Sequence, residues 1–155
     1  IKNFAFSEIY FRFPARFVGL KSCKESFSQD LSKEKVGVIA HSAHEKLLFA
    51  YFPKAQIKTY PNMKSLLLGL QKKDIKLAFG DGYQFSMLLL KTDKNLFTFV
   101  GKPYFAPQIL WGGMQIATLR RQKLLVNAFN YALQSLEKEG KLQELYLRYF
   151  PIDFF

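Results

Sequence analysis

The chain has 155 residues, which is enough for a compact domain with its own core. Apolar residues make up 49% of it and aromatic residues 17%, which excludes a disordered chain. The formal net charge is +11, but the cations are scattered, and no zinc-finger spacing, RNA-binding signature or basic helix is present. We therefore predict a mostly solvated basic surface and no nucleic-acid partner, although the charge could tune encounters with acidic partners or lipid headgroups.

Neither cysteine content nor hydropathy determines the cellular compartment of the protein. Cys23 is the only cysteine, so no internal disulfide can form. It lies among polar residues without an obvious base, so a catalytic nucleophile is not expected. The longest apolar runs are too short to span a bilayer, and no signal peptide is visible, although one could have been removed beforehand.

From residue 35 onward, short apolar runs alternate with helical patterns. Strands are predicted at residues 36–40, 55–60, 76–79 and 97–100, and helices at 42–52, 61–70 and 83–91. This βαβαβαβ order with short connections predicts an α/β fold, with a parallel or mostly parallel sheet covered by helices.

The two ends of the chain have other patterns. Residues 16–20 are predicted to be extended after a proline, and residues 109–118 to form another strand. Apolar residues at helical spacing predict a helix over 125–136, a glycine cap at Gly140, and a second amphipathic helix over 142–149. Trp111 and most of the phenylalanines are expected in the core.

The segment after the first strand of the alternating region predicts an anion site. Ser42 and Glu45 have the spacing of a capping box, so a helix should begin at Ser42 with free backbone N–H groups at its N-terminus. Such a terminus attracts anions. A carboxylate could be held by the Ser42 hydroxyl and by the N–H groups of the turn that includes His41 and Ala43. The alternative is that Ser42 only caps its helix.

A second polar strand end lies at residues 80–82. Asp81 stands there between two glycines, where its carboxylate could accept hydrogen bonds from a ligand ammonium group. In open α/β sheets, ligands bind beyond the carboxyl ends of the strands, so the two strand ends together suit an α-amino acid. Asp81 could equally be an ordinary N-cap. His41, His44 and Glu45 lack a further convergent ligand, so no metal and no cofactor are predicted.

An ordered set of landmarks resembles the family-3 periplasmic solute-binding proteins of polar amino-acid ABC transporters. The set comprises residues 6–10 (FSEIY), 35–45, 60–61, 77–81 (LAFGD), 100–105 (VGKPYF) and 140–150. The resemblance implies a type II periplasmic-binding-protein fold, in which two lobes close on an amino acid that is then delivered to a permease. It implies that Ser42 holds the ligand carboxylate and that Asp81 takes the ammonium group.

Two substitutions depart from the family pattern at the first strand end. His41 replaces a common glycine, and Ala43 stands where many members have Thr or Gly. Residues 6–10 also carry Ile9 in place of the usual proline.

The resemblance also implies a domain organisation. Residues 23–103 would form the second lobe, while residues 1–22 and 104–155 would form the crossover strands and the C-terminal helices of an incomplete first lobe. The apolar faces of those helices would then lack their sheet, which predicts self-association or a domain-swapped dimer. Because the absent part of the first lobe supplies much of the family's site, ligand binding is expected to be weak or lost.

The resulting prediction is a periplasmic or cell-surface solute-binding protein for a free polar or basic amino acid, without catalysis. Two alternatives stay open. One is the sensor domain of a membrane receptor. The other is a cyclohexadienyl dehydratase-like enzyme, since the same fold occurs there and in modules of cell-wall lyases; Glu45, His41 or His44 would then be the candidate acids.

Overall fold

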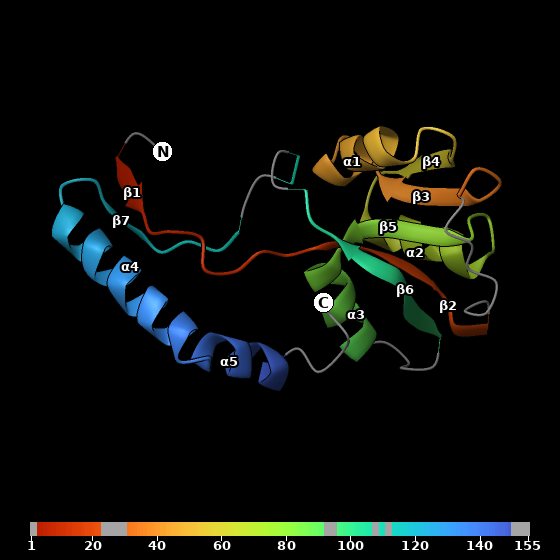
Figure 1. The fold of residues 1–155 in the computed structure, drawn as a ribbon. Helices are drawn as coiled ribbons and strands as arrows, with labels where there is room; N and C mark the ends of the chain where they lie inside the picture. The colour runs from red at the N-terminus through yellow and green to blue at the C-terminus, as the bar shows by residue number, and fades with distance from the viewer. Residues whose placement is uncertain (1–2, 23–30, 92–95, 107–108, 111–112, 150–155) are drawn as a thin grey trace. The chain divides into compact units, whose positions relative to one another are not determined.

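The computed structural model describes residues 3–22, 31–91, 96–106, 109–110 and 113–149 (Figure 1). Cys23 and Trp111 lie outside these residues. The chain divides into two compact units, one of Ile1–Arg12 with Gly112–Ile152 and the other of Phe13–Trp111 with Asp153–Phe155. We call them the helical-tail unit and the sheet unit and describe each by itself.

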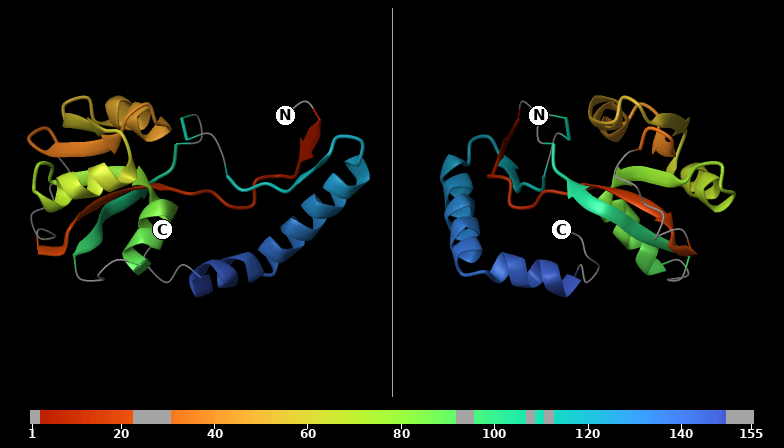
Figure 2. Two further views of the ribbon diagram at one scale, coloured as in Figure 1. Left: turned by 180° about the vertical axis from the view of Figure 1, so that it is seen from behind. Right: turned by 45° about the vertical axis from the view of Figure 1, so that its right-hand side comes forward.

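The sheet unit is built on five strands (Figures 1 and 2). Their spatial order is β4 (Gln56–Tyr60), β3 (Lys35–Ile39), β5 (Leu77–Asp81), β2 (Ala15–Leu20) and β6 (Phe97–Tyr104). Strand β3 pairs in parallel with β4 and β5, whereas β2 pairs antiparallel with both β5 and β6. Four strands therefore run in one direction and β2 in the other, which confirms the predicted mostly parallel α/β fold.

Three helices cover the two faces of this sheet: α1 (Ala43–Tyr51), α2 (Met63–Gln71) and α3 (Gly82–Lys91). Leu47 and Leu48 of α1 join one core cluster with the alternate residues Phe17, Val38 and Phe79 of the sheet. The opposite face packs against α2 and α3, where Leu66, Leu70 and Phe85 are fully buried. The buried residues are the apolar ones that recur at every second position in the strands and at helical spacing in the helices.

One local prediction is wrong and a neighbouring one is confirmed. Residues 109–118 were expected to form one strand, but the described part has only β7 (Ala117–Leu119) and an isolated bridge between Met114 and Phe11. The predicted extended segment 16–20 is strand β2. It occupies a position inside the sheet, between β5 and β6, and all six of its residues are buried.

The helical-tail unit has a different construction. Strand β1 (Phe4–Phe6) pairs antiparallel with β7, and α4 (Lys123–Lys138) and α5 (Lys141–Tyr149) follow. Gly140 lies between the helices at φ 71°, a left-handed conformation typical of a residue that ends a helix. The two predicted helices and the predicted cap are thus confirmed.

Neither tail helix has a buried residue among those described. Large apolar side chains on them are strongly exposed, including Leu124 at 85%, Tyr131 at 76% and Leu147 at 63%. No helix in the described part of the chain is long and apolar enough to cross a bilayer.

Candidate functional site at the carboxyl edge of the sheet

Strand pairing brings the two predicted half-sites to the same edge of the sheet. Strands β3 and β5 are parallel neighbours, so the turn after Ile39 and the end of β5 at Asp81 lie at their common carboxyl edge. Strand β6 ends there too, because Asp81 and Tyr104 both pair with Ala15 of β2. We call this the carboxyl edge. Four residues predicted from the sequence lie on it: His41, Ser42, Ala43 and Asp81.

A complete set of local hydrogen bonds forms the start of α1. The Ser42 hydroxyl donates to the Ile39 carbonyl at 2.7 Å and accepts the Glu45 N–H at 3.1 Å. The Glu45 carboxylate accepts the His41 N–H at 2.7 Å. Ser42 is therefore a true N-cap, and its hydroxyl is already engaged on both its donor and acceptor sides.

His41 makes the sharp turn between β3 and α1. Its φ of 59° lies in the left-handed region, which is costly for a residue with a Cβ and explains why glycine suits this position in the family it resembles. The imidazole is exposed to solvent. The turn directs the next backbone N–H groups, those of Ala43 and His44, out of the helix end, and no described group accepts them.

Asp81 also caps a helix. One of its carboxylate oxygens, Oδ1, accepts the N–H of Gln84 at 2.8 Å in the first turn of α3. The other oxygen has no hydrogen-bond partner among the described residues. The side chain is half-buried. Both capping alternatives left open by the sequence are thus realised, and each half-site retains groups that capping does not use.

Electrostatics link the two half-sites through His44. Burial lowers the pKa of His44 below its ordinary value, and the negative charge of Asp81 partly opposes this shift. The imidazole ring is edge-on to Phe79, with 6.3 Å between the ring centroids. The first turn of α1 therefore lies close enough to Asp81 for their charges to interact.

Tyr104 is the member of this edge that sequence reasoning missed. Its ring is edge-on to Phe17 and Phe79, at centroid distances of 5.6 Å and 6.0 Å, and burial raises the pKa of its hydroxyl. Tyr104 ends β6, and a correct prediction of that strand end would have pointed to it. The predicted strand stopped at residue 100, four residues too early.

Metal binding has no support among the residues that the structure describes. No group of three or more His, Cys, Asp or Glu side chains there could hold an ion. The polar chemistry of the carboxyl edge consists instead of backbone donors at one position and a carboxylate at the other.

Comparison with known proteins gives the relatives of this chain. No family model matches it. The "Arginine-binding periplasmic protein" of Mannheimia haemolytica is 28% identical over 146 residues, which cover 94% of this chain and 58% of that protein. "ABC transporter arginine-binding protein 1" of Escherichia coli is 25% identical over 150 residues, covering 97% and 60%. The chain is a homologue of ABC-transporter solute-binding proteins. It spans about three fifths of the length of these relatives.

Solved structures agree on the fold. The second substrate-binding domain of a putative amino acid ABC transporter from Streptococcus pneumoniae superposes with a TM-score of 0.78 at 21% identity, covering 96% of this chain and 66% of that one. Substrate-binding domain 2 of Lactococcus lactis GlnP in its open conformation gives 0.76 at 19%, covering 98% and 64%. These structures confirm the predicted type II periplasmic-binding-protein fold. The relatives found by sequence confirm the resemblance to solute-binding proteins.

Proposed function

We propose that this chain is part of the amino-acid-binding component of an ABC transporter, that it works in the periplasm, and that it passes a captured amino acid to a membrane permease. The observation that carries the proposal is the meeting of the α1 N-terminus and Asp81 at one edge of the sheet. An α-amino acid carries a carboxylate and an ammonium group a few ångströms apart, and this edge offers a partner for each.

The ligand carboxylate is bound at the start of α1. The N–H groups of Ala43 and His44 donate to it, and the positive end of the helix dipole adds to the attraction. Ser42 contributes indirectly, because its hydroxyl already donates to Ile39 and fixes the turn from which those donors point. His41 shapes the same turn through its left-handed backbone.

The ligand ammonium group is bound by Asp81. Its Oδ1 keeps the hydrogen bond from the Gln84 N–H, while the second oxygen accepts a charge-assisted hydrogen bond from the ligand ammonium group. Burial keeps His44 neutral near neutral pH, so the imidazole does not compete with the ligand for this carboxylate.

The ligand class follows from the named relatives. Two of them are named for arginine, and the sequence by itself allows a polar or basic amino acid. We therefore propose arginine or a similar basic amino acid.

Titration calorimetry of the full chain with L-arginine, L-lysine and L-glutamine tests the assignment. Asp81→Asn should weaken binding of the preferred amino acid at least tenfold, because it removes the charge that pairs with the ammonium group. Asp74→Asn is the matched control, since Asp74 is exposed and lies at the opposite edge of the sheet. Equal affinity in the wild type and in D81N, or no heat with any of the three ligands at millimolar concentration, would contradict the proposal.

We also propose that two copies of this chain associate through the helical tail. Leu124, Tyr131, Leu147 and Tyr149 are 63% to 85% exposed on α4 and α5, and burying them against a second copy would remove apolar surface from water. Exchange of the C-terminal helices is the arrangement we favour. Sedimentation equilibrium should give twice the chain mass at micromolar concentration, and a monodisperse monomer would exclude the association.

The enzymatic and receptor alternatives are not favoured. The relatives found by sequence are named as binding proteins. An ancestral cyclohexadienyl dehydratase shares the fold, with a TM-score of 0.65 at 17% identity, which shows that the fold can host catalysis. In this chain, the carboxylate of the candidate acid Glu45 is occupied by the His41 N–H.

A further inference from the structure

The edge of the sheet opposite the candidate site collects positive charge. We call it the amino edge, because β3, β4 and β5 begin there, while β2, running the other way, ends there. Seven described lysines lie on it, in the segments that lead into or out of these strands: Lys21, Lys33, Lys35, Lys54, Lys72, Lys73 and Lys76. The described carboxylates there are Glu34 and Asp74.

Most of these lysines have no acidic partner among the residues that the structure describes. The Nζ of Lys76 is 2.5 Å from Oε1 of Glu34, which pairs one cation with one carboxylate. None of the other six lysines forms an ion pair within the part of the chain that is described, and all six are exposed. The amino edge therefore presents an excess of accessible ammonium groups to solvent.

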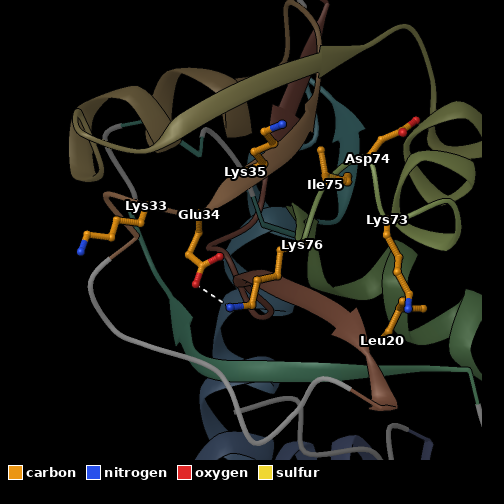
Figure 3. Close-up of a pocket in the computed structure, with 8 residues that line it drawn as sticks. All are labelled: Leu20, Lys33, Glu34, Lys35, Lys73, Asp74, Ile75 and Lys76. Carbon is orange, nitrogen blue, oxygen red and sulfur yellow. Dashed lines mark hydrogen bonds and ion pairs between the residues drawn. The ribbon is translucent and has the colours of Figure 1, made fainter.

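The positions of these groups indicate the shape of their partner. A pocket of about 350 Å³ lies at this edge, with Leu20 and Ile75 in its lining among the charged side chains (Figure 3). In Figure 3, the side chains of Lys33, Lys35 and Lys73 extend in different directions from it and do not converge on one point. A compact anion needs convergent donors, whereas a broad anionic surface can meet cations that are spread apart.

An aromatic side chain accompanies the lysines. Tyr51, the last residue of α1, is 53% exposed and lines a second small pocket together with Lys54. Tyrosine is enriched where proteins meet the headgroup region of a membrane, because its ring is apolar and its hydroxyl is polar. Exposed tyrosine beside spread lysines favours a lipid surface over a purely ionic partner.

The carboxyl edge serves as an internal comparison. The exposed lysines Lys46, Lys64 and Lys102 lie in the first turns of α1 and α2 and near the end of β6. Glu45 and Asp81 lie at the same edge and offset most of that charge. Among the described residues of the sheet unit, the positive charge is therefore concentrated at the amino edge.

We propose that the amino edge is a docking surface for a membrane that contains anionic lipids. Lysines near such a surface are attracted by its negative potential, and each strengthens partition by about fivefold. The attraction falls off within a Debye length, so it weakens as salt is added. This interaction does not depend on ligand binding at the carboxyl edge.

Cosedimentation of the full chain with vesicles tests the docking surface. Wild-type protein should bind vesicles of phosphatidylcholine that include about a third phosphatidylglycerol, should not bind pure phosphatidylcholine, and should lose binding as salt is raised. The triple variant K33Q/K35Q/K73Q should partition roughly 100-fold more weakly. The triple variant K46Q/K64Q/K102Q has the same net charge, and it should bind nearly as the wild type does.

The control separates a docking surface from general electrostatic attraction. Equal weakening in both triple variants would show that only net charge matters and would overturn the proposal. Equal binding to neutral vesicles, or no binding to anionic vesicles at low salt, would overturn it as well. Binding to an acidic protein or a nucleic acid but not to vesicles would assign the amino edge to another class of partner.

Discussion

The two units of this molecule use amphipathic elements with opposite outcomes. In the sheet unit, the apolar faces of α1 and α2 cover a sheet, and side chains such as Leu47, Leu70 and Phe79 are fully buried. In the helical-tail unit, α4 is more strongly amphipathic than α1 or α2, yet none of its described residues is buried. An apolar stripe thus predicts a helix, but its burial depends on whether a partner surface is present.

The largest expected effect tests the sheet unit at its centre. Phe79 is fully buried, and its ring packs against Phe17 with 4.5 Å between centroids. Phe79→Ala should lower the free energy of unfolding by about 3–5 kcal/mol through the lost burial and the cavity it leaves. At a concentration where the chain is monomeric, Leu124→Ala, at a side chain that is 85% exposed in α4, should change it by less than about 0.5 kcal/mol. Urea unfolding of both variants checks the contrast, and equal losses would contradict it.

A smaller effect is expected where two elements approach each other closely. A Cβ at Gly37 of β3 would lie 2.7 Å from a Leu66 methyl group of α2 and would also collide with Ile75. Gly37→Ala should therefore cost about 1–3 kcal/mol through overpacking.

Gly140→Ala in the tail is the informative comparison for Gly37→Ala. A Cβ added at Gly140 would meet no atom within 4 Å. Only the backbone conformation at φ 71° then opposes the change, which should lower the free energy of unfolding by about 1 kcal/mol. Thermal unfolding should rank G37A as the less stable variant, and the reverse order would show that sheet packing is looser than described.

The next effect concerns what holds α5 in the tail unit. The Tyr146 hydroxyl donates to the Tyr10 carbonyl at 2.5 Å, and its ring packs on Phe11 at 4.4 Å between centroids. Tyr146→Phe should keep the ring contact and remove the hydrogen bond, which destabilises this unit by about 1 kcal/mol. Amide hydrogen exchange should then quicken in α5 and stay unchanged in β3 and β5. Faster exchange throughout both units would mean that they unfold together.

The smallest effect is a pH dependence located in the sheet unit. In the unfolded chain His44 titrates near pH 6.5, and burial lowers its pKa in the folded state. Between the two pKa values the unfolded state holds more protons, so the free energy of unfolding falls as the pH is lowered below about 6.5. Above that pH both states are neutral and the effect vanishes. His44→Gln should flatten this slope in urea titrations between pH 7.5 and 5, and an unchanged slope would exclude His44 as its source.

Local pattern was sufficient for most elements of the sheet unit. The strands and helices predicted between residues 36 and 91 appear within about two residues of their expected bounds. Pro53 ends one helix, and Asn62 caps the next by accepting the Ser65 N–H. These features depend on neighbouring residues only, which is why the sequence determines them.

The carboxyl edge was predictable in part. Ser42 comes after β3 and Asp81 ends β5. These two strands pair in parallel, and the carboxyl ends of such strands meet whatever the sequence between them. Tyr104 was not predicted as a site residue, because Gly101 and Pro103 interrupt the strand pattern near the end of β6. That end is formed by pairing with β2, which is distant in the sequence. The hydrogen bond from Ser42 to Ile39 was not predicted either, although it is local, because it depends on a left-handed turn at His41 that a residue with a Cβ rarely adopts.

By itself, the sequence determined the alternating elements, the mostly parallel sheet and the residues at the two strand ends, since these follow from periodicity and capping. Tertiary structure decided three other things: that β2 runs antiparallel between β5 and β6, that the scattered lysines gather at the amino edge, and that the faces of α4 and α5 stay uncovered. The reason is the same for all three. Each depends on which distant segments lie side by side, and such pairings are set by the packing of the whole unit.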